Sequence, residues 1–124
     1  MRIINILSRH MAGALLVIVA GALIACGSAA NDKELIESAK SYMAERQVSE
    51  ALIELKNALQ TNPKNAEARY LMGEISMQIG DLASAEKEFQ RALEMGWNAE
   101  AALVGEMRAM MAQRKYKEVI ELSN

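Results

Sequence analysis

Residues that stand 34 positions apart share their type along most of this chain. Ala51 matches Ala85, and Ala58 matches Ala92. A fixed period of this length is typical of chains in which each repeat forms a pair of helices. Small residues are needed where the two helices of a pair approach closely, and stacked pairs bury a continuous core. The sequence therefore predicts an all-α solenoid whose extended surface is suited to holding a protein partner.

Three blocks of this period follow one another without insertions: residues 32–65, residues 66–99 and the partial block 100–124. The middle block carries the fullest pattern of small and aromatic residues, which consists of Met72, Gly73, Gly80, Asp81, Ala85, Phe89 and Ala92. These residues resemble the tetratricopeptide repeat. At the turn where the middle block has Gly-Asp, the first block has Arg46-Gln47 and the third has Arg114-Lys115.

Local signals predict helices independently of that resemblance. Residues 49–61 place apolar side chains at helical spacing on one stripe, which predicts an amphipathic helix. Pro63 ends this helix, because proline disfavours helical geometry in the residue before it. Gly96 is expected to close the second pair in the left-handed conformation. Asp32 and Asn65 are expected to cap helix N-termini.

The resemblance implies a concave face lined by the first helix of each pair, with the fifth, ninth and twelfth residues of each block pointing into it. The predicted partner-binding residues are therefore Ile36, Lys40, Met43, Tyr70, Glu74, Met77, Val104, Arg108 and Met111. Methionine recurs at the twelfth position of every block, and its flexible thioether adapts to irregular partner surfaces. The alternative is that the three methionines only fill gaps between helices. Trp97 is expected to cover the end of the second pair.

The amino terminus has the pattern of a secretory signal peptide. Residues 1–25 place basic residues before an apolar run of 15 residues. The next feature closely resembles a bacterial lipobox: Leu23, Ile24, Ala25 and Cys26. That resemblance implies cleavage before Cys26 and acylation of this cysteine, with residues 26–31 as a lipidated tether, and two or more acyl chains give stable attachment. Gly27 in place of an aspartate implies an outer-membrane lipoprotein facing the periplasm. An uncleaved helix in the inner membrane is the alternative.

Composition excludes several classes of function. Outside the signal, 12 basic residues face 16 acidic ones, so no nucleic-acid partner is expected. The single histidine, His10, lies in the signal, and the single cysteine is the predicted lipidation site. This leaves no His-based or Cys-based catalytic or metal site, so we expect no enzyme activity, no cofactor and no metal. Glu86, Glu88 and Glu94 are interpreted as a solvated face, with pairing along the helix to Arg91.

A closer resemblance covers about two thirds of the chain. The segments ALIELKNALQTNPKNAEARYLMGEI (51–75) and GDLASAEKEFQRALEMGW (80–97) resemble the PEP-CTERM system tetratricopeptide lipoproteins. Members of that family accompany exosortase-type sorting systems of bacteria that make exopolysaccharide. The resemblance implies a membrane-anchored scaffold for protein sorting or export in the cell envelope. The alternative is a pilotin-like or outer-membrane assembly lipoprotein that carries a secretion or pilus subunit.

The last helix of the third block ends in an apolar stretch, with Tyr116, Val119, Ile120 and Leu122 near its end. A stacked repeat leaves its outer face apolar unless a polar capping helix follows. The sequence therefore predicts either further repeats beyond this helix or self-association through this end.

Overall fold

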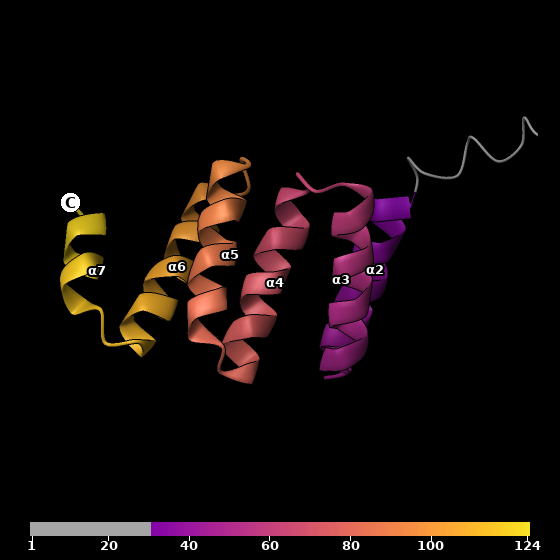
Figure 1. The fold of residues 1–124 in the computed structure, drawn as a ribbon, viewed down its shortest axis with the longest axis horizontal. Helices are drawn as coiled ribbons and strands as arrows, with labels where there is room; N and C mark the ends of the chain where they lie inside the picture. Colours follow the sequence, from indigo (N-terminus) through magenta and orange to yellow (C-terminus); the bar gives the residue numbers. More distant parts are fainter. Residues whose placement is uncertain (1–30) are drawn as a thin grey trace, which may run out of the picture. The chain divides into compact units, whose positions relative to one another are not determined.

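The computed structural model describes residues 31–124, and these residues form six helices (Figure 1). These are α2 (Asn31–Ala44), α3 (Val48–Thr61), α4 (Ala66–Ile79), α5 (Leu82–Glu94), α6 (Ala99–Ala112) and α7 (Tyr116–Leu122). The described residues contain no strand, so the prediction of an all-α solenoid is confirmed. Within this part of the chain, no helix has the length and apolarity needed to cross a membrane. The predicted signal peptide and lipobox lie outside the described residues.

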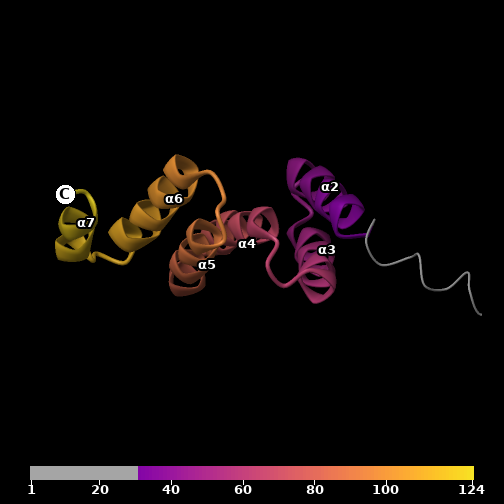
Figure 2. The ribbon, with the colours of Figure 1, turned by 90° about the horizontal axis from the view of Figure 1, so that it is seen from above.

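Each helix packs antiparallel against the next, and the pairs stack side by side. The closest pairings are α2 with α3, α4 with α5, and α5 with α6. Helix α4 also contacts both α2 and α6, whereas no contact joins α3, α5 and α7 to one another within residues 31–124. The first helices of the pairs therefore share one side of the array, as the view from above shows (Figure 2).

Four tight turns end helices by the same device. At each turn one residue has a positive φ, and these residues are Arg46 (59°), Gly80 (80°), Gly96 (84°) and Arg114 (63°). The amide of the following residue donates to a carbonyl five residues back, as in the bonds from Gln47 to Tyr42 (2.8 Å) and from Asp81 to Ser76 (2.9 Å). This is the hydrogen bond of a Schellman motif. The prediction for Gly96 is confirmed.

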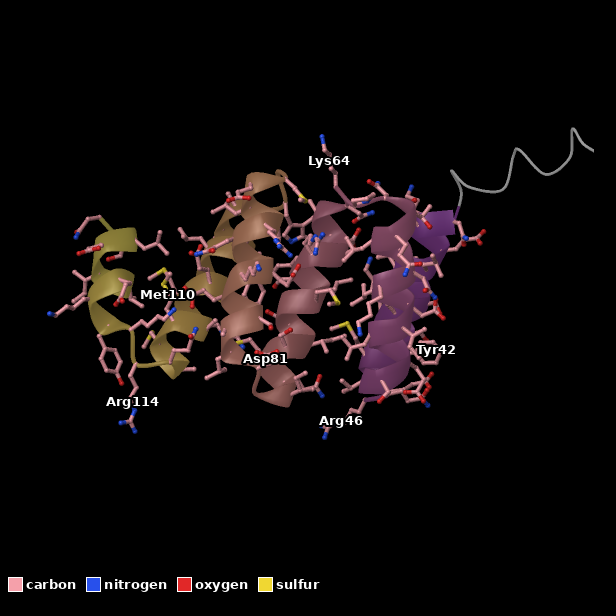
Figure 3. The ribbon with its side chains drawn as sticks, in the orientation of Figure 1. Tyr42, Arg46, Lys64, Asp81, Met110 and Arg114 are labelled. Carbon is pink, nitrogen blue, oxygen red and sulfur yellow. The ribbon has the colours of Figure 1, made fainter. Side chains whose placement is uncertain are left out.

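Two arginines therefore stand where glycine is the usual residue. Arg46, Gly80 and Arg114 occupy the same position of three successive blocks. Arg46 and Arg114 lie with Asp81 at one end of the helices, and Lys64 lies at the opposite end (Figure 3). Because a Cβ atom makes the left-handed conformation costly, the stacking of the helix pairs must stabilise these two turns.

Asparagine and aspartate side chains cap three helix N-termini. The amide oxygen of Asn65 accepts from the Ala68 amide at 2.9 Å, and Asn98 and Asp81 cap α6 and α5 in the same way. The prediction for Asn65 is confirmed, but the prediction for Asp32 is wrong. Helix α2 begins at Asn31, so Asp32 lies inside its first turn. The Asp32 carboxylate accepts from the side chains of Asn62 (2.9 Å) and Asn65 (3.1 Å), which joins α2 to the loop before α4.

Small residues allow the helices of a pair to approach closely. Ala51, Ala58, Ala85 and Ala92 are all fully buried. One core cluster fills the space among α2, α3 and α4 around Leu55, and a second surrounds Phe89. Both clusters lie within residues 31–124, and this segment therefore has the hydrophobic core needed to fold by itself.

Several charged side chains lie between helices rather than on a solvated face. Glu88 is buried and accepts from Arg69 of α4 at 3.0 Å and from Arg91 at 2.9 Å. Glu86 accepts from Lys115, which precedes α7, at 2.7 Å. The pairing of Glu88 with Arg91 is confirmed, but the interpretation of Glu86 and Glu88 as solvent-facing is wrong. Their other partners, Arg69 of α4 and Lys115 in the loop before α7, lie outside α5, and a periodic pattern within one helix does not identify them.

Candidate interaction surface

An aromatic cluster holds α4 and α6 in place. These are the first helices of the second and third pairs, and they carry most of the predicted binding residues. The Phe89 ring of α5 is fully buried, and its centroid lies 5.6 Å from that of Tyr70 on α4. Trp97, in the loop before α6, stacks on Tyr70 with a centroid distance of 5.7 Å and an interplanar angle of 29°. The indole therefore packs on the second pair, and Tyr70 is held from two sides.

Two glycines bring α4 and α6 onto the same edge of the Phe89 ring. A Cβ atom built on Gly73 of α4 would lie 2.7 Å from Phe89 Cε1, and one built on Gly105 of α6 would lie 2.7 Å from the same atom. Real Cβ contacts are essentially never this short. Only glycine therefore allows both first helices to approach the ring, and this contact sets the spacing between them.

Ion pairs link neighbouring first helices along the same side. Arg108 Nη1 of α6 donates to Glu74 Oε1 of α4 at 3.4 Å. One repeat earlier, Lys40 Nζ of α2 contacts Glu67 Oε1 of α4 at 2.6 Å and Glu37 Oε1 at 2.8 Å. The charges thus alternate along the array, and each cation faces a carboxylate.

The surroundings of two of these groups shift their pKa. Burial raises the pKa of the Tyr70 phenol, and the negative charge of Glu74 raises it further. Hydrogen bonds to Glu37 and Glu67 raise the pKa of the Lys40 ammonium. Tyr70 is therefore a neutral hydrogen-bonding group and Lys40 a stable cation across the physiological pH range.

Three of the predicted binding residues form an exposed stripe on α6. Val104, Arg108 and Met111 stand four and three residues apart, the spacing that places side chains on one helix face. Half of the surface of Val104 (50%) and of Met111 (53%) is exposed. The guanidinium between them is also exposed, so the stripe combines two apolar contacts with one cation. We call this set the α6 stripe.

Three of the other predicted binding residues pack in the interior of the protein. Met43 packs against the first core cluster and Met77 against the second, so these two methionines fill gaps between helices. Met111 is the methionine of the three that faces solvent. Ile36 is only 2% exposed and belongs to the first core cluster. Its assignment to a binding face is wrong, because the side chain packs into the core among α2, α3 and α4.

Helix α6 carries apolar residues on its exposed side as well as on its buried side. Ala102, Gly105, Ala109 and Met110 are buried, while Val104 and Met111 carry apolar surface into solvent. An ordinary surface helix has a polar outer face. The apolar outer face of α6 therefore marks a surface suited to contact with another chain.

The family follows from a comparison with known repeats. A family model described as "Tetratricopeptide repeat" matches residues 42–103, which is half of the chain. This chain belongs to the tetratricopeptide repeat family. A search of the curated proteins finds no match to it. Tetratricopeptide repeats mediate protein–protein binding. The matched residues include Tyr70, Phe89 and Trp97, and they end directly before Val104, the first residue of the α6 stripe.

Some residues that shape this surface carry no signal in the repeat pattern. Gly105 has no glycine counterpart one or two blocks earlier, where Leu71 and Glu37 stand. Glu106 is buried and accepts from Gln90 of α5 at 2.7 Å, although its sequence neighbourhood gives no sign of a partner. Both positions depend on which helix α6 meets, and that is decided by the stacking.

Proposed function

We propose that this protein is a non-enzymatic, lipid-anchored scaffold that binds a partner protein in the bacterial cell envelope. The observation that carries the binding part is the α6 stripe. Val104 and Met111 are half exposed on a helix that the aromatic cluster holds rigidly against α4. A preformed apolar surface with one charged group binds without a large ordering cost.

The proposed partner inserts apolar side chains next to Val104 and Met111 and places a polar or acidic group near Arg108. Arg108 already faces Glu74 across a contact of 3.4 Å, at the long end of the hydrogen-bond range. A carboxylate on the partner competes for this guanidinium. The partner is therefore a protein segment with apolar residues beside an acid.

The envelope location rests on the sequence of residues 23–26. Leu23-Ile24-Ala25-Cys26 resembles a lipobox, and the proposed anchor is an acylated Cys26 in the outer membrane, facing the periplasm. The proposed system is protein sorting or export linked to exopolysaccharide, through the resemblance of residues 51–75 and 80–97 to PEP-CTERM lipoproteins. Copurification of a secretin or pilus subunit instead would favour a pilotin-like assembly role.

Site-specific photocrosslinking in cells tests the binding surface. A photoreactive amino acid at position 104 or 111 should crosslink to one discrete envelope protein, and the same group at Ile53 should not. Ile53 is a matched control because it is apolar, 57% exposed and placed on a second helix, α3. Equal crosslinking from positions 53, 104 and 111 would reject the α6 stripe as the site.

A separate experiment tests the anchor. We expect Cys26→Ser to abolish labelling by fatty acid and to release the protein from the outer-membrane fraction. Globomycin should cause an unprocessed precursor of the wild-type protein to accumulate. Unchanged size and membrane attachment of the Ser variant would overturn the lipoprotein proposal and leave the uncleaved inner-membrane helix.

A further inference from the structure

We infer that the pair formed by α2 and α3 swings as one unit on α4, so that the array is hinged between its first and second pairs. Two stacking interfaces lie one repeat apart in this chain, α3 against α4 and α5 against α6. Helix α5 packs more extensively on α6 than α3 packs on α4. The side chains at equivalent positions of the two interfaces explain the difference.

Polar side chains join α5 to α6 at two levels. Gln90 Nε2 donates to Glu106 Oε1 at 2.7 Å. At the end of α6, Gln113 Nε2 donates to Glu86 Oε2 at 2.6 Å and to the Leu82 carbonyl at 3.2 Å. Both carboxylates are largely buried, and hydrogen bonds to charged groups are strong and directional. These bonds therefore fix α6 against α5.

The equivalent positions of α3 and α4 carry no such bonds. One repeat earlier, the two bonded pairs are replaced by Lys56 with Met72 and by Leu52 with Ile79. Neither combination joins a donor to a strong acceptor. Within residues 31–124, the side chains of α3 and α4 form no hydrogen bond or ion pair with each other. Apolar contact holds this interface, and such contact is non-directional.

The apolar contact also stops short of the end of α4. Ala68, Met72, Ile75 and Ile79 stand at helical spacing on the stripe of α4 that begins in the first core cluster. Ile75 is fully buried in this cluster, whereas Ile79, one turn further, is 54% exposed. The interface therefore loosens towards Ile79, and a more closed position of the first pair would cover this side chain.

The polar links between the first pair and α4 lie at the opposite end. The Asp32 carboxylate accepts from Asn62 and Asn65, which stand on the two sides of the turn between α3 and α4. Lys40 also pairs with Glu67 in the first turn of α4, but this pair is partly exposed and therefore weak. The first pair is thus fastened near residues 62–65 and loose near Ile79, so these loop residues act as the pivot.

A swing about this pivot changes the spacing between α2 and α4 on the side that the first helices share. Helices α4 and α6 stay together, because Gly73 and Gly105 both approach the Phe89 ring. Helix α4 has 14 residues and is about 20 Å long, so a rotation of about 10° moves its far end by about 3.5 Å relative to α3. The array therefore adapts its curvature at one interface, and this inference does not depend on the α6 stripe.

Pulsed electron paramagnetic resonance of residues 31–124 tests the hinge, since this segment has no native cysteine to compete for spin labels. One labelled protein carries Ile53→Cys and Gln78→Cys, across α3 and α4 near the loose end. The matched protein carries Lys87→Cys and Ala112→Cys, at the equivalent positions of α5 and α6, and all four sites are exposed. We expect the first distance distribution to be wider than the second by about 3 Å or more. Equal widths would overturn the hinge.

Two variants test whether the polar bonds cause the difference. Leu52→Glu/Ile79→Gln copies the bonded pair of the second interface and should narrow the first distribution. Gln113→Ala removes the bonds to Glu86 and Leu82 and should widen the second distribution, and it keeps the test valid if the double variant does not fold. Circular dichroism establishes which variants are folded. Unchanged widths in the folded variants would overturn the assignment of the hinge to these positions.

Discussion

The close approach of Gly73 to Phe89 predicts that Gly73→Ala destabilises the wild-type protein. In a variant that lacks the Phe89 ring, the same substitution should be stabilising. Gly73→Ala adds a methyl group to a helix interior, which by itself stabilises a helix by about 1 kcal/mol. In this fold the added Cβ would lie 2.7 Å, 2.8 Å and 3.0 Å from three carbons of the Phe89 ring. Ordinary contacts begin near 3.4 Å, so the ring or α4 must shift by several tenths of an ångström.

The surroundings of the ring make that shift costly. Phe89 is fully buried, and Gly105 of α6 approaches the same ring atoms so closely that a Cβ atom built on it would lie 2.7 Å from Cδ1 and Cε1. Tyr70 packs on the ring as well, with a centroid distance of 5.6 Å. Overpacking of a filled core costs about 1 to 3 kcal/mol. After subtraction of the gain in helix propensity, Gly73→Ala should lower the free energy of unfolding by about 0 to 2 kcal/mol.

A double-mutant cycle separates the two effects. In a Phe89→Leu background the ring is absent, so Gly73→Ala should raise the free energy of unfolding by about 0.5 to 1 kcal/mol through helix propensity alone. The coupling between the two positions should then be about 1 to 3 kcal/mol. Urea unfolding of residues 31–124, followed by circular dichroism, measures all four proteins. Equal effects of Gly73→Ala in the two backgrounds would show that the glycine does not make room for the ring.

Three further predictions concern packing, turn geometry and pH. Ala51→Leu should overpack α2 against α3 and cost about 1 to 3 kcal/mol, while Lys87→Leu at an exposed position should have little effect on thermal unfolding. Arg46→Gly should stabilise the fold by about 0.5 to 1 kcal/mol, because glycine adopts the left-handed conformation without a Cβ penalty, and a loss of stability in urea would contradict this. Hydrogen bonding to Ser84 lowers the pKa of Asp81 below its ordinary 3.8, so its contribution is present above that value and is lost as the pH falls through the folded pKa. Thermal unfolding between about pH 2 and about pH 5 should therefore show less acid sensitivity in Asp81→Asn than in wild type, and equal acid sensitivity would refute the role of this cap.

Most of the fold was predictable because its determinants are local or strictly periodic. Small residues recur at a fixed step, and each marks a close approach of paired helices that the structure contains. The caps and stops read from Asn65, Pro63 and Gly96 act within one turn of chain. Each of these signals depends only on residues within a short segment. It can therefore be recognised without knowing which distant residues the helix contacts.

The candidate site was predictable only in part. Repeat position placed Val104, Arg108 and Met111 on one helix face, and the structure leaves all three exposed. The same rule placed Ile36 on that face, yet the structure buries it. Repeat position specifies which helix face a residue occupies, whereas exposure depends on how much of that face the neighbouring pair covers.

The sequence by itself determined the repeat length, the helices and the turns between them, because period, caps and breakers act through neighbouring residues. Tertiary structure alone decided which charges are buried and which glycines meet an aromatic ring. Glu88 meets Arg69 from another helix, and Gly105 meets Phe89 from the preceding one. In each case the deciding contact joins different helices, and its energy exists only once the pairs have packed.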